Sequence, residues 1–94
     1  MFIMVSCAAG LGSSFMVRMN VQKILEDMGI EAEVEHSDLS TATTYRADIF
    51  VTAKNFAETF SNVKGYVIAL DNIVDQVELK EKLIIAMDAV NSKK

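Results

Sequence analysis

The chain has 94 residues, of which 51% are hydrophobic and 23% charged, with four glycines and no proline. At about 150 residues per domain, this length supports one domain, and the composition excludes a disordered or low-complexity chain. Nine basic against thirteen acidic residues leave a net charge of −4, without the basic stripe that nucleic-acid binding needs. We therefore expect a single domain over residues 1–94 that binds no nucleic acid.

The cysteine count and the hydropathy pattern bear on the cellular compartment. Cys7 is the one cysteine and His36 the one histidine, so an internal disulfide is excluded and no zinc site is expected. No apolar run approaches the roughly 18 residues of a membrane-spanning helix, and the residues before Cys7 are too few for a secretory signal. We expect a cytoplasmic protein with a reduced thiol, no metal, no cofactor and no membrane insertion of its own.

Strand and helix signals alternate along the first third of the chain. The short apolar run Phe2–Val5 predicts a buried strand, and a glycine-containing segment follows it. From about Ser14 the spacing becomes that of an amphipathic helix that ends at Gly29, since glycine readily adopts the left-handed conformation of a helix end. The apolar stripe of this helix consists of Val17, Val21, Ile24, Leu25 and Met28.

The rest of the chain continues the alternation. Residues 30–36 alternate acidic and small apolar side chains, which predicts an edge strand with one solvated face. Residues 37–44 have room for only a short helix or turn. The apolar runs 48–52 and 66–70 predict strands in the middle of a parallel sheet, with a weak helix at 55–60 between them. A last helix starts near Asp75, which resembles a capping pair with Glu78, and its predicted stripe is Leu79, Leu83, Ile84, Met87 and Val90.

This order of elements implies an α/β fold. We expect an open four-stranded parallel sheet, Rossmann-like or flavodoxin-like, with right-handed crossovers that place helices on both faces. In such sheets, ligands bind outside the carboxyl ends of the strands, near the point where the strand order reverses. The first strand leads directly to Cys7, so the chemistry is expected there.

The segment Cys7-Ala8-Ala9-Gly10-Leu11-Gly12-Ser13-Ser14 has the properties of an anion-binding loop. Successive backbone N–H groups of such a loop converge on an anion, and the following helix N-terminus adds partial positive charge. Gly10 and Gly12 allow the backbone to curl, and Ser13 and Ser14 can cap the helix. A lone cysteine is most often a small buried residue, but in this setting we expect a nucleophilic thiol of lowered pKa.

Strand, Cys-x-x-Gly-x-Gly-Ser-Ser segment and helix together resemble the phosphorylation loop of IIB components of the bacterial phosphoenolpyruvate-dependent sugar phosphotransferase system. With Met16 and Met19-Asn20-Val21 after it, the segment is similar to the ascorbate-type branch rather than to the lactose/chitobiose or galactitol branches. The resemblance implies that Cys7 accepts a phosphoryl group from a phosphohistidine of a cognate IIA protein. Cys7 then passes the group to an ascorbate-like substrate in a membrane IIC transporter.

The resemblance also implies that the segment from Ala8 to Ser14 binds the phosphoryl group. Asp38, Thr52 and Asp71 are expected in loops at the same edge of the sheet, without an assigned role. His36 is interpreted as a satisfied rather than a catalytic histidine. Arg18 is interpreted as pointing away from the loop. Met16, Met19 and Met28 are interpreted as core filling rather than as a recognition groove, with the alternative that any exposed members dock a partner.

Two other functions stay open on the sequence alone. A low-molecular-weight tyrosine phosphatase or an arsenate reductase has a similar scaffold and a Cys-x5-Arg-Ser/Thr loop. Here Ser13 stands in the place of the arginine, which such an enzyme needs to stabilise the transferring phosphoryl group. The other possibility is a non-catalytic anion-binding or regulatory module in which Cys7 has no role.

Overall fold

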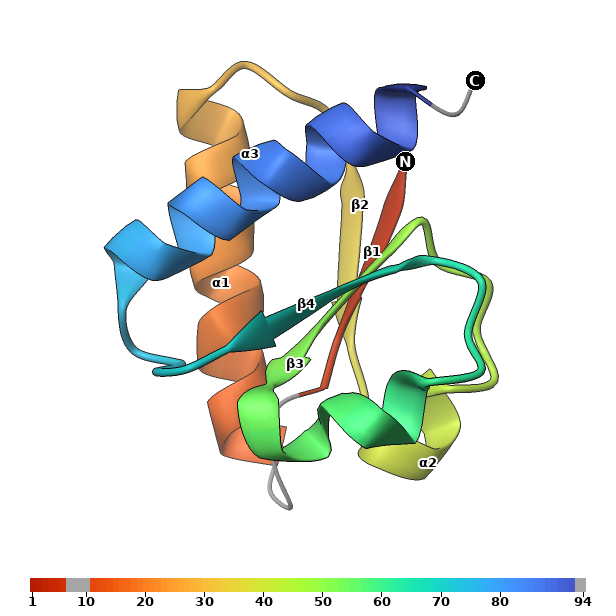
Figure 1. Cartoon of the computed structure of the whole chain (residues 1–94). Coiled ribbons are helices and arrows are strands. Elements are labelled where there is room, and N and C mark those ends of the chain that lie inside the picture. The colour runs from red at the N-terminus through yellow and green to blue at the C-terminus, as the bar shows by residue number, and fades with distance from the viewer. Residues whose placement is uncertain (7–10, 93–94) are drawn as a thin grey trace.

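The computed structural model of the chain describes residues 1–6 and 11–92, and for residues 11–13 and 92 it describes the backbone alone. Strands and helices alternate along the chain in the expected order (Figure 1). The elements are β1 (Phe2–Val5), α1 (Leu11–Asp27), β2 (Glu33–His36), α2 (Leu39–Ala42), β3 (Ile49–Ala53), the 3-10 helix η1 (Lys54–Phe60), β4 (Tyr66–Leu70) and α3 (Gln76–Ser92). In the described part of the chain, no helix is long and apolar enough to cross a membrane.

The strands of the described residues form one four-stranded parallel sheet in the order β2-β1-β3-β4. β1 pairs with both β2 and β3, so Val5 lies between His36 and Val51. From β1 the chain first moves outward to β2 and then returns past β1 to β3. The strand order therefore reverses between β1 and β3, and the predicted α/β fold with an open parallel sheet is confirmed.

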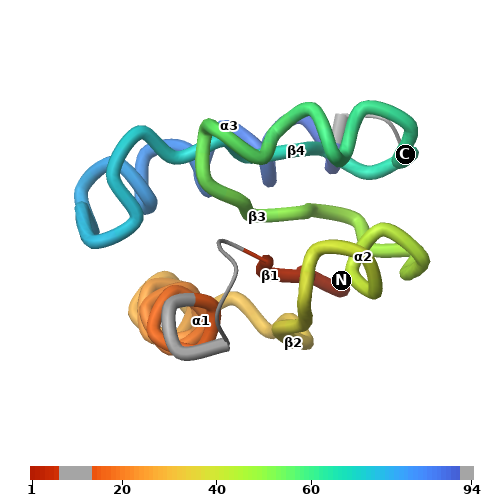
Figure 2. The backbone as a smooth tube through the Cα atoms, turned by 90° about the horizontal axis from the view of Figure 1, so that it is seen from below, coloured from red at the N-terminus to blue at the C-terminus, as the bar shows by residue number. Residues whose placement is uncertain are grey.

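Hydrophobic side chains cover both faces of this sheet. Successive strand residues point to opposite faces, so Ile3 and Val5 pack against α1 and α3, whereas Met4 points the other way. On that second face Met4 packs with Phe50 and Phe60. Figure 2, viewed from below, shows α1 and α2 on opposite sides of the strands. Because helices cover both faces, the end of the sheet at which the strands have their carboxyl termini is left open. We call this end the carboxyl edge.

The end of α1 follows the prediction from its sequence. Gly29 has a φ of 71°, and its N–H donates to the Glu26 carbonyl at 3.0 Å. The Ile30 N–H donates to the Leu25 carbonyl at 2.9 Å. These two bonds form a Schellman motif, which satisfies carbonyls that the helix itself leaves free.

Several element boundaries differ from the sequence prediction. α1 begins at Leu11 rather than near Ser14. A glycine costs a helix only about 1 kcal/mol, so Gly12 does not prevent a strong amphipathic helix from extending one turn earlier. β2 covers only Glu33–His36, because its single neighbour β1 has four residues and pairs from Phe2 to Val5. The expected edge position of β2 is confirmed.

Two predictions are wrong, one about the position of a strand in the sheet and one about the burial of a helix residue. β4 lies at the second edge of the sheet rather than in its middle. On α3, Ile84 is 47% exposed and Ala86 is fully buried instead. The buried face of α3 is formed by Leu79, Leu83, Ala86 and Met87, at helical spacings i, i+4, i+7 and i+8, and Ile84 lies beside this face rather than on it.

The capping pair at the start of α3 is half confirmed. The Asp75 carboxylate accepts from the backbone N–H groups of Val77 and Glu78 at 3.0 and 3.1 Å. The Glu78 carboxylate does not return to Asp75 but accepts from the N–H groups of Asp71 and Asn72. It therefore holds the loop after β4 against the helix.

Candidate functional site

The carboxyl ends of β1 and β3 form the centre of the candidate site. The Ser6 N–H, just after β1, donates to the Val51 carbonyl at 2.9 Å, and the Ser37 N–H donates to the Val5 carbonyl at 3.1 Å. Because the strand order reverses between β1 and β3, this is the point at which open parallel sheets bind ligands. Cys7 and residues 8–10 follow Ser6 directly in the sequence and lie outside the described residues, so the roles predicted for them stay predictions.

Two side-chain hydroxyls at this edge are buried and have no hydrogen-bond partner among the described residues. They are Ser6 Oγ and Thr52 Oγ1. The register pairs Val5 with Val51, and the bond from the Ser6 N–H to the Val51 carbonyl continues it by one residue, so Ser6, just after β1, lies beside Thr52 of β3. Leaving a buried hydroxyl unpaired costs about 1–3 kcal/mol. Such groups at the ligand-binding edge indicate a polar partner other than the described residues.

From the sequence, Thr52 is predicted both as the last residue of the strand over 48–52 and as a residue of a loop at the carboxyl ends of the strands, and the structure places it inside β3. Ser6 is not among the residues singled out from the sequence. The sequence does contain a signal for Ser6. This serine stands between the apolar strand Phe2–Val5 and Cys7, at a position where a buried strand would ordinarily have another apolar residue.

Residues 11–14 form the first turn of α1. The expected loop therefore ends earlier, and the prediction that Ser13 and Ser14 cap the helix is wrong because both lie inside it. Gly12 likewise has a helical backbone rather than that of a loop. The N–H groups of a first turn have no acceptor within the helix and carry partial positive charge. The turn thus has the donors that the predicted anion site requires, and Ser14 is buried within it.

Asp38 and Asp71 lie after β2 and β4, at the predicted edge, and each has a structural partner. Asp38 caps α2, since its carboxylate accepts from the Thr41 N–H at 2.7 Å. Hydrogen bonds from the Thr41 side chain and then from its backbone N–H lower the pKa of the Asp38 carboxyl, so Asp38 is unsuited to donate a proton at neutral pH. Asp71 faces Lys54 at 3.9 Å, with both side chains exposed.

Arg18, the first cation after the cysteine segment, is bound to β2. Its Nε donates to the Val34 carbonyl at 3.0 Å, and a second guanidinium nitrogen lies 3.3 Å from His36 Nδ1. The third lies 3.7 Å from the Glu35 carboxylate. A guanidinium only donates, so Nδ1 of His36 is the acceptor in this contact. His36 is therefore a satisfied histidine, as predicted.

The prediction that the methionines of α1 fill the core is wrong for two of them. Met16 and Met19 are exposed, as is Phe15, while Met28 packs partly against the core. The three exposed residues lie outside the helix stripe that contains Val17 and faces the sheet. The Phe15 ring also contacts His36 edge to face, with centroids 5.6 Å apart.

Comparison with known proteins agrees with this architecture. A family model described as the lactose/cellobiose-specific IIB subunit of the PTS system matches residues 2–84. The chain is also similar to the ascorbate-specific PTS system EIIB component of Mycoplasma pneumoniae (strain ATCC 29342 / M129 / Subtype 1). The two are 27% identical over 84 residues, which cover 86% of this chain and 88% of that protein. The resemblance seen in the cysteine segment thus extends over residues 2–84, and the chain belongs to the PTS IIB family.

Proposed function

We propose that this chain carries a phosphoryl group on Cys7 between a IIA protein and a IIC transporter. The single observation that carries the proposal is the membership of the PTS IIB family in a chain with one cysteine, which follows β1 at the ligand-binding edge. The buried hydroxyls of Ser6 and Thr52 at that edge give further support. On this proposal the protein works in the cytoplasm and exchanges phosphate with the membrane transporter without entering the bilayer.

The proposed chemistry consists of two successive phosphoryl transfers. The Cys7 thiolate attacks the phosphorus of the IIA phosphohistidine, so an S–P bond forms and the P–N bond breaks; the histidine ring leaves with the electron pair of that bond and takes up a proton to become imidazole. A hydroxyl of the substrate then attacks the same phosphorus; an O–P bond forms, the thiolate leaves, and the hydroxyl proton passes to a base. We assign the backbone N–H groups from Ala8 to Ser14 to binding the phosphoryl group in both steps, because donors of a loop and a helix start suit an oxyanion.

The substrate that we propose is L-ascorbate. The support is the similarity of the cysteine segment to the ascorbate-type branch and the ascorbate-specific relative from Mycoplasma pneumoniae. The family model carries lactose and cellobiose in its description, so family membership by itself does not name the sugar.

The partner surface that we propose surrounds the site. A carrier must present Cys7 to two partners in turn, and such transient contacts are small, at or below roughly 1,200 Å² in total. Chemical-shift mapping with the cognate IIA protein should perturb the residues from Ala8 to Met16 together with those near Asp38, Thr52 and Asp71. Shifts confined to α3 would contradict this surface.

Intact-mass analysis tests the acceptor role. After incubation with phosphoenolpyruvate, the general phosphotransferase proteins and a cognate IIA protein, the mass should rise by one phosphoryl group. Cys7→Ser should abolish the rise, whereas His36→Gln, which removes the one histidine, should retain it. Transfer of the label to His36 in the wild-type chain would overturn the proposal.

A further inference from the structure

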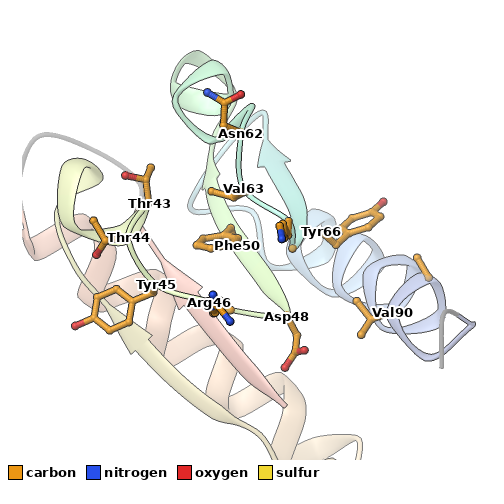
Figure 3. A pocket seen from close by; sticks show the side chains of 14 residues that line it. Thr43, Thr44, Tyr45, Arg46, Asp48, Phe50, Asn62, Val63, Tyr66 and Val90 are labelled. Carbon is orange, nitrogen blue, oxygen red and sulfur yellow. The ribbon is translucent and has the colours of Figure 1, made fainter.

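A cavity lies at the amino ends of β3 and β4, at the opposite end of the strands from Ser6 and Thr52. It has a volume of about 500 Å³ and lies between the segment that leads into β3, the segment that leads into β4 and the C-terminal part of α3 (Figure 3). Ligand pockets in proteins have volumes of about 300–1,000 Å³. From the groups that surround this cavity, we propose that it binds a small organic phosphate or carboxylate.

The walls of the cavity are held in place by the backbone. The Asp48 N–H donates to the Phe2 carbonyl and the Phe2 N–H donates to the Asp48 carboxylate, both at 2.8 Å. The Tyr66 N–H donates to the Asp48 carbonyl at 2.9 Å. Gly65 is essential to this contact, because a Cβ there would collide with the Ala47 carbonyl oxygen and approach the Phe50 ring to 3.0 Å. The cavity is therefore preformed rather than created by a ligand.

The floor of the cavity is apolar. Phe50 is 1% exposed and contributes its ring, and Val63 and Val90 line the cavity on either side of it. Figure 3 shows these three side chains coming from β3, from the loop before β4 and from α3. A surface of this kind suits the body of a small organic molecule, with its polar groups directed outward.

The rim of the cavity carries positive charge. Arg46 and Lys64 both line it, and neither has an ion pair with another described residue, whereas Arg18, Lys54 and Lys82 each have a carboxylate partner. Asp48 is the one acidic side chain of the lining, and its carboxylate is already bonded to the Phe2 N–H. The lining thus has a formal excess of positive charge in a chain whose net charge is −4.

These features together define the ligand. A guanidinium and an ammonium both line the cavity and can bind phosphate or carboxylate by charge-assisted hydrogen bonds, and the apolar lining adds contact for the rest of the molecule. The site is at the amino ends of β3 and β4, whereas the proposed phosphoryl site is at the carboxyl ends. The two sites can therefore be occupied at the same time, and this inference does not depend on the proposed function.

A residue-resolved titration of the full ¹⁵N-labelled chain tests the site. The probe is phenylphosphonate, which combines an anion with an apolar ring and is not hydrolysed. It should shift the amides of residues 43–48 and 62–66 in a saturable manner, and more strongly than inorganic phosphate or benzyl alcohol alone. A parallel titration with benzoate distinguishes the two anions, and saturable binding of either at these amides supports the site.

Charge-matched variants separate a specific site from general electrostatic attraction. Arg46→Gln combined with Lys64→Gln should weaken binding of phenylphosphonate by about tenfold, since both anion-binding groups are lost. Lys23→Gln combined with Lys80→Gln removes the same charge from exposed positions that do not line the cavity, and should leave the affinity unchanged. Equal affinities in the two double variants, shifts confined to the carboxyl edge, or equal binding of benzyl alcohol would overturn the proposal.

Discussion

The Glu78 carboxylate lies 2.8 Å from the Lys82 ammonium, one turn further along α3. The same carboxylate accepts from the backbone N–H groups of Asp71 and Asn72 at 2.8 and 3.0 Å. Lys82 in turn donates to the Ala69 carbonyl at 2.6 Å. The side chains of Glu78 and Lys82 thus fix the end of β4 and the loop after it. This loop lies at the carboxyl ends of the strands, where the candidate site is.

This arrangement predicts a dependence of stability on pH. The hydrogen bond from Lys82, followed by those from Asp71 and Asn72, lowers the pKa of Glu78 to about 2 from its ordinary value of 4.5. A carboxyl with a lowered pKa in the folded state stabilises the fold above its unfolded pKa and loses that contribution as the pH falls through its folded pKa. We therefore expect the contribution of Glu78 to disappear between about pH 4.5 and pH 2.

Urea unfolding at a series of pH values measures this contribution. Glu78→Gln should be less stable than the wild type near pH 6, and the difference should shrink as the pH falls toward 2. Glu81→Gln, at an exposed position of the same helix, is the control and should change stability little at any pH. A difference for Glu78→Gln that stays constant with pH would contradict the assignment.

Thr52→Val should stabilise the fold and slow phosphoryl transfer. The Thr52 hydroxyl is buried and has no partner among the described residues, so its removal should raise the free energy of unfolding by about 1 kcal/mol. If the hydroxyl serves the site, the same substitution should lower the rate at which the IIA protein phosphorylates the chain. Urea unfolding and the mass assay measure the two effects.

Thr44→Val is the matched control for that substitution. The Thr44 hydroxyl donates to the Thr41 carbonyl at 2.7 Å, so its loss should not stabilise the fold, and Thr44 lines the cavity described above rather than belonging to β3 beside Ser6. A Thr52→Val variant with an unchanged phosphorylation rate would show that the hydroxyl has no part in the site.

Gly29→Ala should destabilise the protein by about 1 kcal/mol. The cost comes from the backbone, because Gly29 has a φ of 71° and nothing lies within 4 Å of a Cβ built there. Gly29→Asn should recover part of the loss, since asparagine tolerates this conformation better than alanine. Chemical denaturation compares the three proteins, and equal stability of the alanine and asparagine variants would argue against a conformational cause.

The purified protein should hydrolyse p-nitrophenyl phosphate slowly or not at all. Ser13 stands where phosphatase loops of this kind have an arginine, and Arg18 is bound to β2 through the Val34 carbonyl. Without a guanidinium beside the transferring phosphoryl group, its developing charge lacks the usual stabilisation. Release of p-nitrophenol measures the activity, and rapid turnover that depends on Cys7 would favour the phosphatase alternative over the carrier.

The sequence predicts the fold well because each strand and helix has its own periodicity and its own end signal. Gly29 marks the end of α1, and the run Phe2–Val5 matches β1 residue for residue. The edge position of β4 could not be read from its sequence, because a short apolar run does not show which neighbours pair with it. The start of α1 was missed because its first turn carries no apolar stripe.

The candidate site was only partly predictable. The predicted strand ends and the position of Cys7 in the sequence indicate where the site lies. That Ser6 lies beside Thr52 depends on the register between β1 and β3, which a short stretch of sequence does not determine. The exposure of Met16 and Met19 was misjudged because residue type was given more weight than helical phase relative to Val17. The cavity at the amino ends of β3 and β4 is lined by segments that are distant in the sequence, so it can be recognised only when the fold is known.

The contact of Lys82 with the Ala69 carbonyl also affects how copies of the chain meet. β4 is an outer strand of the sheet, and an outer strand offers unpaired carbonyl groups on which a strand from another molecule can add. The Lys82 ammonium occupies one of these carbonyls, so an approaching strand would have to displace a charged group from its hydrogen bond before it could pair. Lys82, which bonds the end of β4 and pairs with the Glu78 carboxylate that holds the loop after it, therefore also opposes intermolecular sheet growth at high protein concentration.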